Sequence, residues 1–207
     1  MQLNKLLNYA FVLIILSVIL FAQENFELSY SLKNLESKNE IKDVLVEITA
    51  INKNTEEEYT LTNYMAENKI TIHREKGDYK IIIKVDNLDS DSKDFYYEDD
   101  INLDGNLEKE ALLFSVGTLR GTVLDSLDNI VKADLKFECS KDYGEKKPKS
   151  TDKYGFFVVD YMPVGNCRIV ASRGDSIGLA DIKIEKGKVT DIQIKLNKSK
   201  KSSIFPI

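Results

Sequence analysis

From residue 24 onward, apolar and polar residues alternate with a period of two. The runs 44–49, 70–73 and 79–84 follow this pattern, and short stretches rich in Asn, Asp and Gly separate such runs, as at 52–54 and 104–106. Because successive side chains of a strand point to opposite faces, this alternation predicts half-buried antiparallel strands. Strands at such short spacing are typical of β-sandwiches, so we predict an all-β fold.

A domain boundary is predicted near Gly117. Residues 24–116 contain about seven candidate strands and residues 118–197 contain six or seven, each piece being the size of a small sandwich. Two tandem β-sandwich domains are therefore favoured over one large sheet. The first is assigned by pattern alone as Ig-like or prealbumin-like, and its stretch 107–113 can also be interpreted as a short helix. Residues 198–207 form a tail that is polar and then apolar.

The first 23 residues differ sharply from the rest. Lys5 supplies a positive charge, and residues 11–22 are apolar apart from Ser17. This apolar core is shorter than the roughly 20 residues that a membrane-spanning helix requires. We therefore predict a signal peptide cut after Ala22. The alternative is an uncleaved signal-anchor in contact with the membrane, because the run 6–22 is marginally long and no A-x-A site precedes residue 24. Either way, the rest of the chain is expected to be secreted or at the cell surface.

The charge balance and the scarcity of histidine exclude several functions. With 29 Lys+Arg against 34 Asp+Glu the net charge is −5, which offers no basic excess for nucleic acid. The chain has one histidine, His73, which is expected to lie exposed on a strand, and it lacks a nucleophile elbow, a glycine-rich phosphate loop and an H-E-x-x-H pattern. We expect no catalytic residues and no cofactor. A hydrolase would need a carboxylate pair that sequence proximity does not identify.

Three short motifs lie between residues 119 and 197: G-x-V-x-D at 121–125, T-D-x-x-G-x-F at 151–157 and M-P-x-G at 162–165. Together they resemble the carboxypeptidase regulatory-like family, whose members are transthyretin-like β-sandwiches. The residues that carry the resemblance are Gly121, Asp125, Thr151, Asp152, Gly155, Phe157, Pro163 and Gly165. The resemblance implies a module without an active site, which serves as an accessory or stacking domain on secreted and membrane-bound proteins.

The motif residues also have physical roles that do not depend on the family. Thr151 and Asp152 can bond to nearby backbone, and Gly155 permits a positive φ at the turn. Phe157 is expected to point into the core. Asp128 and Ile130 depart from the family pattern, since they stand where a turn glycine and a proline are common.

The two cysteines are expected to meet. Cys139 shares a strand face with Leu135, and Cys167 shares one with Ile169, so both sulfur atoms should point into one core. An even cysteine count in an exported domain favours a disulfide. The alternative is two buried free thiols, and a metal site is disfavoured because no further soft ligand is nearby.

Two further features allow alternative interpretations. Asp100, Asn102 and Asp104 have the spacing of a calcium loop, but its twelfth position is an alanine, so a plain acidic turn is the favoured interpretation. Residues 95–97, Phe-Tyr-Tyr, place aromatic rings on both faces of a strand. At least one ring is expected to be exposed, either as a contact for a partner or sugar or simply as part of an edge strand.

These observations predict a non-enzymatic exported protein that acts as a structural or interaction module of the cell envelope, or as an extracytoplasmic subunit of a membrane complex. Its expected partner is another envelope or membrane protein. The alternative function is a calcium- or carbohydrate-binding surface module.

Overall fold

The structure is a computed structural model that describes residues 25–87, 90–143 and 146–198. The predicted signal segment, residues 1–23, and all but the first residue of the tail lie outside these ranges. Within them, no helix is long and apolar enough to cross a membrane. The strands are β1 (Asn25–Asn34), β2 (Val44–Asn52), β3 (Glu58–Met65), β4 (Lys69–Glu75), β5 (Gly77–Asp86), β6 (Phe95–Leu103), β7 (Leu107–Leu124), β8 (Asp134–Cys139), β9 (Phe156–Pro163), β10 (Gly165–Arg173), β11 (Ser176–Ile184), β12 (Val189–Lys195) and β13 (Asn197–Lys198).

The prediction of an all-β fold with two tandem sandwiches is confirmed. In the first sandwich, one layer has the order β4-β1-β7 and the other the order β3-β2-β5-β6, and a short pairing of β6 with β7 joins them. Alternate residues of these strands fill one core, whose largest fully buried side chains include Tyr30, Ile48 and Ile81. The two-residue alternation of the sequence therefore marks the buried face.

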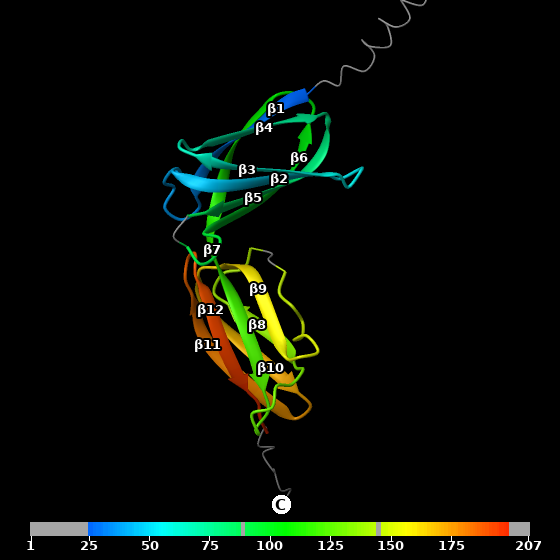
Figure 1. Cartoon of the computed structure of the whole chain (residues 1–207), viewed down its shortest axis with the longest axis vertical. Helices are drawn as coiled ribbons and strands as arrows, with labels where there is room; N and C mark the ends of the chain where they lie inside the picture. The colour runs from blue at the N-terminus through cyan, green and yellow to red at the C-terminus, as the bar shows by residue number, and fades with distance from the viewer. Residues whose placement is uncertain (1–24, 88–89, 144–145, 199–207) are drawn as a thin grey trace, which may run out of the picture.

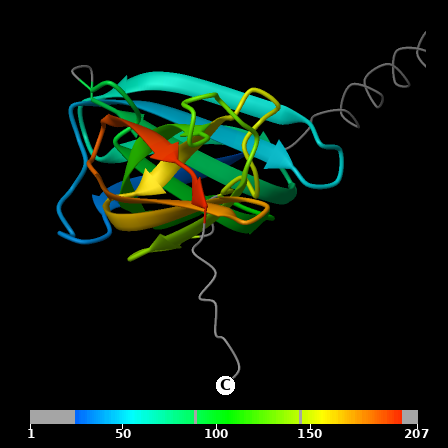
Figure 2. The ribbon, with the colours of Figure 1, turned by 90° about the horizontal axis from the view of Figure 1, so that it is seen from below.

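The second sandwich is built in the same way. The second half of β7 lies between β9 and β12, and the facing layer has the order β13-β11-β10-β8. A separate core, which includes Leu119, Phe157 and Ile169, fills the space between these layers. The two sandwiches are stacked end to end along the long axis of the molecule (Figure 1), and Figure 2 views them along that axis.

Strand β7 belongs to both sandwiches. It contains 18 residues, which corresponds to about 60 Å of extended chain. Its first half pairs with β1, and its second half pairs with β12 and β9. The boundary predicted near Gly117 thus falls inside a strand instead of a loop. Domains at 24–116 and 118–197 remain our proposal, which the two separate cores support.

The structure decides one alternative and corrects one prediction. The stretch 107–113 is the first part of β7 and not a short helix, because its alternate residues Ala111 and Leu113 are completely buried in the first core. In addition, not every strand pair is antiparallel: β1 and β12 both run parallel to β7. β12 enters the layer of β7 from β11 of the facing layer, and β7 itself follows β6 of the facing layer, long after β1 in the chain, so neither parallel pair is joined by a hairpin.

Candidate functional site

The predicted disulfide is confirmed. Cys139, the last residue of β8, is bonded to Cys167 in the neighbouring strand β10, and the two residues lie directly opposite each other in the register. No free cysteine remains. The bond joins residues 28 positions apart and ties β8, which is the outer strand of its layer, to the strand beside it.

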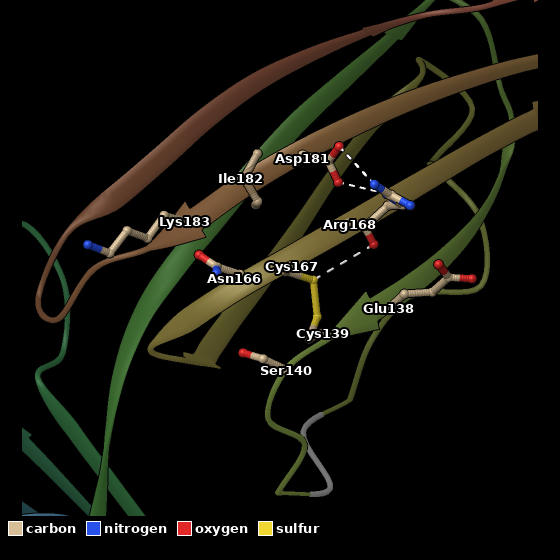
Figure 3. A pocket seen from close by; sticks show the side chains of 9 residues that line it. All are labelled: Glu138, Cys139, Ser140, Asn166, Cys167, Arg168, Asp181, Ile182 and Lys183. Atoms are coloured by element: carbon tan, nitrogen blue, oxygen red, sulfur yellow. Dashed lines mark hydrogen bonds and ion pairs between the residues drawn. A yellow bond between two sulfur atoms is a disulfide. The ribbon is translucent and has the colours of Figure 1, made fainter.

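An open hollow of about 820 Å³ lies over this disulfide (Figure 3). The side chains of Arg168 and Asp181 point toward each other there and form two hydrogen bonds, of 2.7 and 3.1 Å. The guanidinium of Arg168 holds the pKa of the Asp181 carboxyl below its usual range, through these bonds. The other lining residues are Glu138, Ser140, Asn166, Ile182 and Lys183. With Arg168 and Asp181 paired and polar side chains around them, the hollow offers a polar surface for contact.

Gly121 and Phe157 of the motif set lie directly opposite each other on β7 and β9. The ring of Phe157 covers the glycine so closely that a Cβ atom at position 121 would lie 2.1 Å from its Cζ. Phe157 is 5% exposed, as its predicted place in the core requires. The glycine is therefore needed to make room for the ring.

The aspartates and the threonine of the motif set hold turns. The Asp125 carboxylate accepts hydrogen bonds from the backbone N–H groups of Leu127 and Asn129, which lower its pKa. Asp152 accepts in the same way from Tyr154 and Phe156. The buried hydroxyl of Thr151 accepts a bond of 3.0 Å from the N–H of Ala133, and Gly155 has a φ of +75°. The bonds of Asp152 and the positive φ of Gly155 agree with the local roles expected for them, and the Thr151 hydroxyl adds a local bond of 3.2 Å to the Asp152 carbonyl, whereas its contact with Ala133 reaches a segment 18 residues away.

The departure from the family pattern at Asp128 has a simple explanation. Asp128 has a φ of +64°, so it adopts the left-handed conformation that a glycine would supply, which aspartate tolerates better than most residues. Pro163 ends β9 and Gly165 begins β10, and the N–H of Val164 between them donates to the carbonyl of Ser115. Each of the eight motif residues thus lies in a turn, at a strand end or in the core, where its local contacts account for it.

The candidate calcium residues lie on and beside the end of β6. Asp100 forms an ion pair of 2.9 Å with Lys53, and the Asn102 amide donates a hydrogen bond of 2.7 Å to Asp78. Asp104 follows in the turn to β7. Among the described residues no cluster of three or more His, Cys, Asp or Glu side chains is arranged to hold a metal ion. The extended backbone of β6 through Leu103 spaces these side chains along a strand instead of folding them around a point.

The junction of the two sandwiches is the most elaborate site, and the sequence did not reveal it. A bulge in β9 places Tyr161 at a φ of +58°, a conformation that is rare for a bulky residue. Its ring stacks on Tyr96 of β6, with ring centres 4.6 Å apart, and Tyr96 also contacts Phe114 of β7. Burial, followed by the hydrogen bond to Glu98, raises the pKa of Tyr96. A strained residue of one sandwich thus packs onto an aromatic pair of the other.

This contact also corrects the prediction for residues 95–97. Phe95 is buried, and Tyr96 and Tyr97 are both partly buried, so none of the three is an exposed contact residue. Their cover comes from Tyr161, which is 64 or more residues away in sequence, and from Tyr30, whose ring lies 6.0 Å from that of Tyr97. A strand pattern cannot reveal a cover contributed by so distant a segment.

Polar contacts close the other side of the junction. Asp94 is 1% exposed, and its carboxylate accepts bonds from the N–H of Asn87 and the hydroxyl of Ser90. The hairpin between β11 and β12 reaches this loop, because Ser92 donates its N–H to the carbonyl of Gly187. A Cβ atom at Gly187 would lie 2.5 Å from an Asp94 carboxylate oxygen, so this position requires glycine.

No family model and no curated protein matches the sequence. Among solved structures, the chain is similar to GBS52, the minor pilin of Streptococcus agalactiae, with 14% identity over 88% of this chain and 100% of that one and a TM-score of 0.33. The shaft pilin SpaA of Lactobacillus rhamnosus GG gives 10% identity, 88% and 99% coverage, and 0.33. The Bacillus anthracis TIE protein gives 14% identity over 84% of this chain, which spans only 34% of that protein, and 0.33. At such values these likenesses assign neither an activity nor a partner, and the carboxypeptidase regulatory-like resemblance stays a prediction.

Proposed function

We propose that this protein is an exported, non-enzymatic structural module of the cell envelope that acts as a stiff two-domain spacer. The observation that carries the proposal is strand β7, which runs without interruption from one hydrophobic core into the other. The first described strand begins at the far end of the upper sandwich, and the last ends at the opposite pole of the lower one (Figure 1). A chain that passes from pole to pole in this way separates whatever is joined to its two ends.

Stiffness at the junction supports the same proposal. Domains joined by a flexible linker are expected to move relative to each other. Here a relative rotation would disturb the pairing of β7 with strands of both sandwiches, the stack of Tyr161 on Tyr96, and the bonds between residues 90–94 and the β11–β12 hairpin. Several contacts of different kinds would have to change together, so one orientation is favoured.

The proposal extends to location and partner. Residues 1–23 are proposed to export the chain, either as a cleaved signal or as an anchor, so that the spacer lies outside the cytoplasm. Its partner is proposed to be another envelope or membrane protein that contacts an exposed sheet face. The alternative, a calcium- or carbohydrate-binding module, gains no comparable support, because Asp100 and Asn102 are already engaged by Lys53 and Asp78.

The stiffness is tested by ¹⁵N relaxation of the processed chain. We expect one rotational correlation time for amides of both sandwiches. Insertion of Gly-Ser-Gly-Ser between Val116 and Gly117 is the control, since it interrupts β7 and should give each sandwich its own, shorter value. Two distinct values in the unaltered chain would overturn the spacer proposal. Export is tested separately, by adding protease to intact cells of the source organism: a protein that is protected until the cells are lysed contradicts it.

A further inference from the structure

Strand β3 is the outer strand of its layer, and it lacks the features that normally keep such a strand from pairing with another chain. In the described part of the chain it pairs only with β2, in an unbroken register. Its eight residues, Glu58–Met65, include no proline, lysine or arginine. A long and regular outer strand is a template beside which another strand can form.

Two other outer strands carry such protective features. β4 contains Lys69, Arg74 and Glu75, and the Arg74 guanidinium lies 3.2 Å from the centre of the Tyr59 ring. β9 contains a bulge and ends in Pro163. Positive charges, bulges and prolines on an outer strand oppose the addition of a further strand. Strand β3 differs from β4 and β9 because it has none of the three.

The backbone of β3 offers a row of hydrogen-bonding groups on its outer side. An antiparallel ladder bonds every second residue of a strand to its neighbour. The N–H of Asn52 donates to the carbonyl of Glu57, so the odd-numbered residues of β3 are the ones bonded to β2. The N–H and C=O groups of the even-numbered residues point away from β2: Glu58, Thr60, Thr62 and Tyr64.

The core-facing side chains of β3 are incompletely covered. Tyr59 and Leu61 pack against the first core but are only half-buried, whereas Ala50 and Ile48, which lie opposite them on β2, are 1% and 0% exposed. The cover of the core therefore decreases toward β3. A strand placed beside β3 would bury the remaining apolar area of Leu61.

The outer side of β3 fits a second copy of itself. In an antiparallel arrangement centred on Leu61, Glu58 faces Tyr64 of the second copy and Thr60 faces its Thr62, so every outward-pointing residue is paired. No like charges meet, because Glu58 is the only charged residue of the strand, and a pair of threonines is favourable. A register shifted by two residues leaves one outward-pointing residue of each copy unpaired, so the centred register forms the most hydrogen bonds.

We propose that two copies of this protein associate through β3, with a two-fold axis at Leu61. The contact joins the β3-β2-β5-β6 layers of the two copies into one continuous layer and buries Leu61 of one copy against Leu61 of the other. The spacer is then one half of a pair. This association does not depend on the stiffness of the junction, so the two proposals fail independently.

The first test is sedimentation velocity of the processed chain between about 10 µM and about 1 mM, the range in which small interfaces associate. We expect a monomer–dimer equilibrium. Thr62→Pro removes an outward N–H and leaves the ladder with β2 intact, since proline is tolerated on the solvent side of an outer strand. It should weaken the dimer by at least about tenfold, because the two-fold axis removes two hydrogen bonds at once. The matched control Thr62→Val keeps the N–H and should dimerise like the unaltered chain.

Cysteine substitution tests the register and does not rely on Thr62→Pro folding correctly. Opposite residues that are not hydrogen-bonded to each other have Cα atoms about 4.5 Å apart, which permits a disulfide. Leu61→Cys should therefore form a disulfide-linked dimer on mild oxidation, since the described chain has no free cysteine of its own. Asn63→Cys is the control on the same face of β3, because its counterpart in the second copy lies about 13 Å away along the strand.

Four results would each overturn the proposal. They are a chain that stays monomeric at the highest concentration, an unchanged dimer in a Thr62→Pro variant that keeps its circular dichroism spectrum, no cross-link in Leu61→Cys, and equal cross-linking of Leu61→Cys and Asn63→Cys.

Discussion

Replacement of Gly121 by alanine should strongly destabilise the second sandwich. The new methyl group would lie 2.1 and 2.2 Å from two carbon atoms of the Phe157 ring. Carbon atoms pack at about 3.5–4.0 Å, so the ring must retreat by more than about 1 Å. It has little room to do so, because it is buried and its edge contacts Phe137, with ring centres 6.0 Å apart. Overpacking of a filled core costs about 1–3 kcal/mol, and we expect the upper part of that range.

The assay is urea unfolding followed by far-ultraviolet circular dichroism, with three comparisons. Gly105→Ala is the control, since nothing lies within 4 Å of its Cβ position, and it should be neutral or stabilise by about 0.5 kcal/mol. Phe157→Leu makes room at position 121, so the double variant should be more stable than the sum of the single changes by at least about 1 kcal/mol. Additive effects, or a neutral Gly121→Ala, would show that the ring does not constrain this position.

Two further predictions concern the disulfide and the buried tyrosines. Reduction of the Cys139–Cys167 bond reopens a loop of 28 residues and should lower the free energy of unfolding by about 3–4 kcal/mol. An unchanged urea midpoint in reductant would contradict this expectation. Thiol alkylation of the intact protein without reductant would contradict the bond itself. Burial, with nearby carboxylates, raises the folded-state pKa of Tyr30 and Tyr96 above the ordinary value of about 10. The fold therefore favours the neutral phenols. Their contribution to stability is complete below about pH 10 and is lost as the pH rises above this value. The urea midpoint should therefore fall between about pH 9 and pH 11, less steeply in Tyr30→Phe, and a midpoint that rises over this interval would refute the assignment.

The second sandwich was the more predictable half because its signals are local. Asp125 and Asp152 bond to backbone groups two and four residues ahead, so the residues that fix each turn stand together in the sequence. The pairing of Cys139 with Cys167 followed from two alternating strand faces. Even the departure at Asp128 concerned one residue and one φ angle, and the surrounding turn was correctly placed.

The junction was not predictable because its signals are distant. Tyr161 packs on a residue 65 positions earlier, and the bulge that turns it there has no marker in the sequence comparable to a glycine or proline. Burial of Asp94 depends on a hairpin at 185–188. The alternative of a helix at 107–113 could not be decided from the sequence for a related reason, since the strand partner that decides it is β1, about 80 residues earlier in the chain.

The strain at Tyr161 suggests how the two sandwiches are held in one orientation. A non-glycine residue at positive φ costs about 1–3 kcal/mol and persists only where its surroundings impose it. Here the stack on Tyr96 and the pairing of β9 with β7 on both sides of the bulge impose it together. Strand β7 alone would keep the sandwiches joined but leave them free to twist about its axis, because a single extended strand offers little resistance to torsion about that axis. The off-axis contacts at Tyr161 and at Asp94, contributed by different loops, supply the resistance to twisting that the strand lacks, and so both are needed for a stiff spacer.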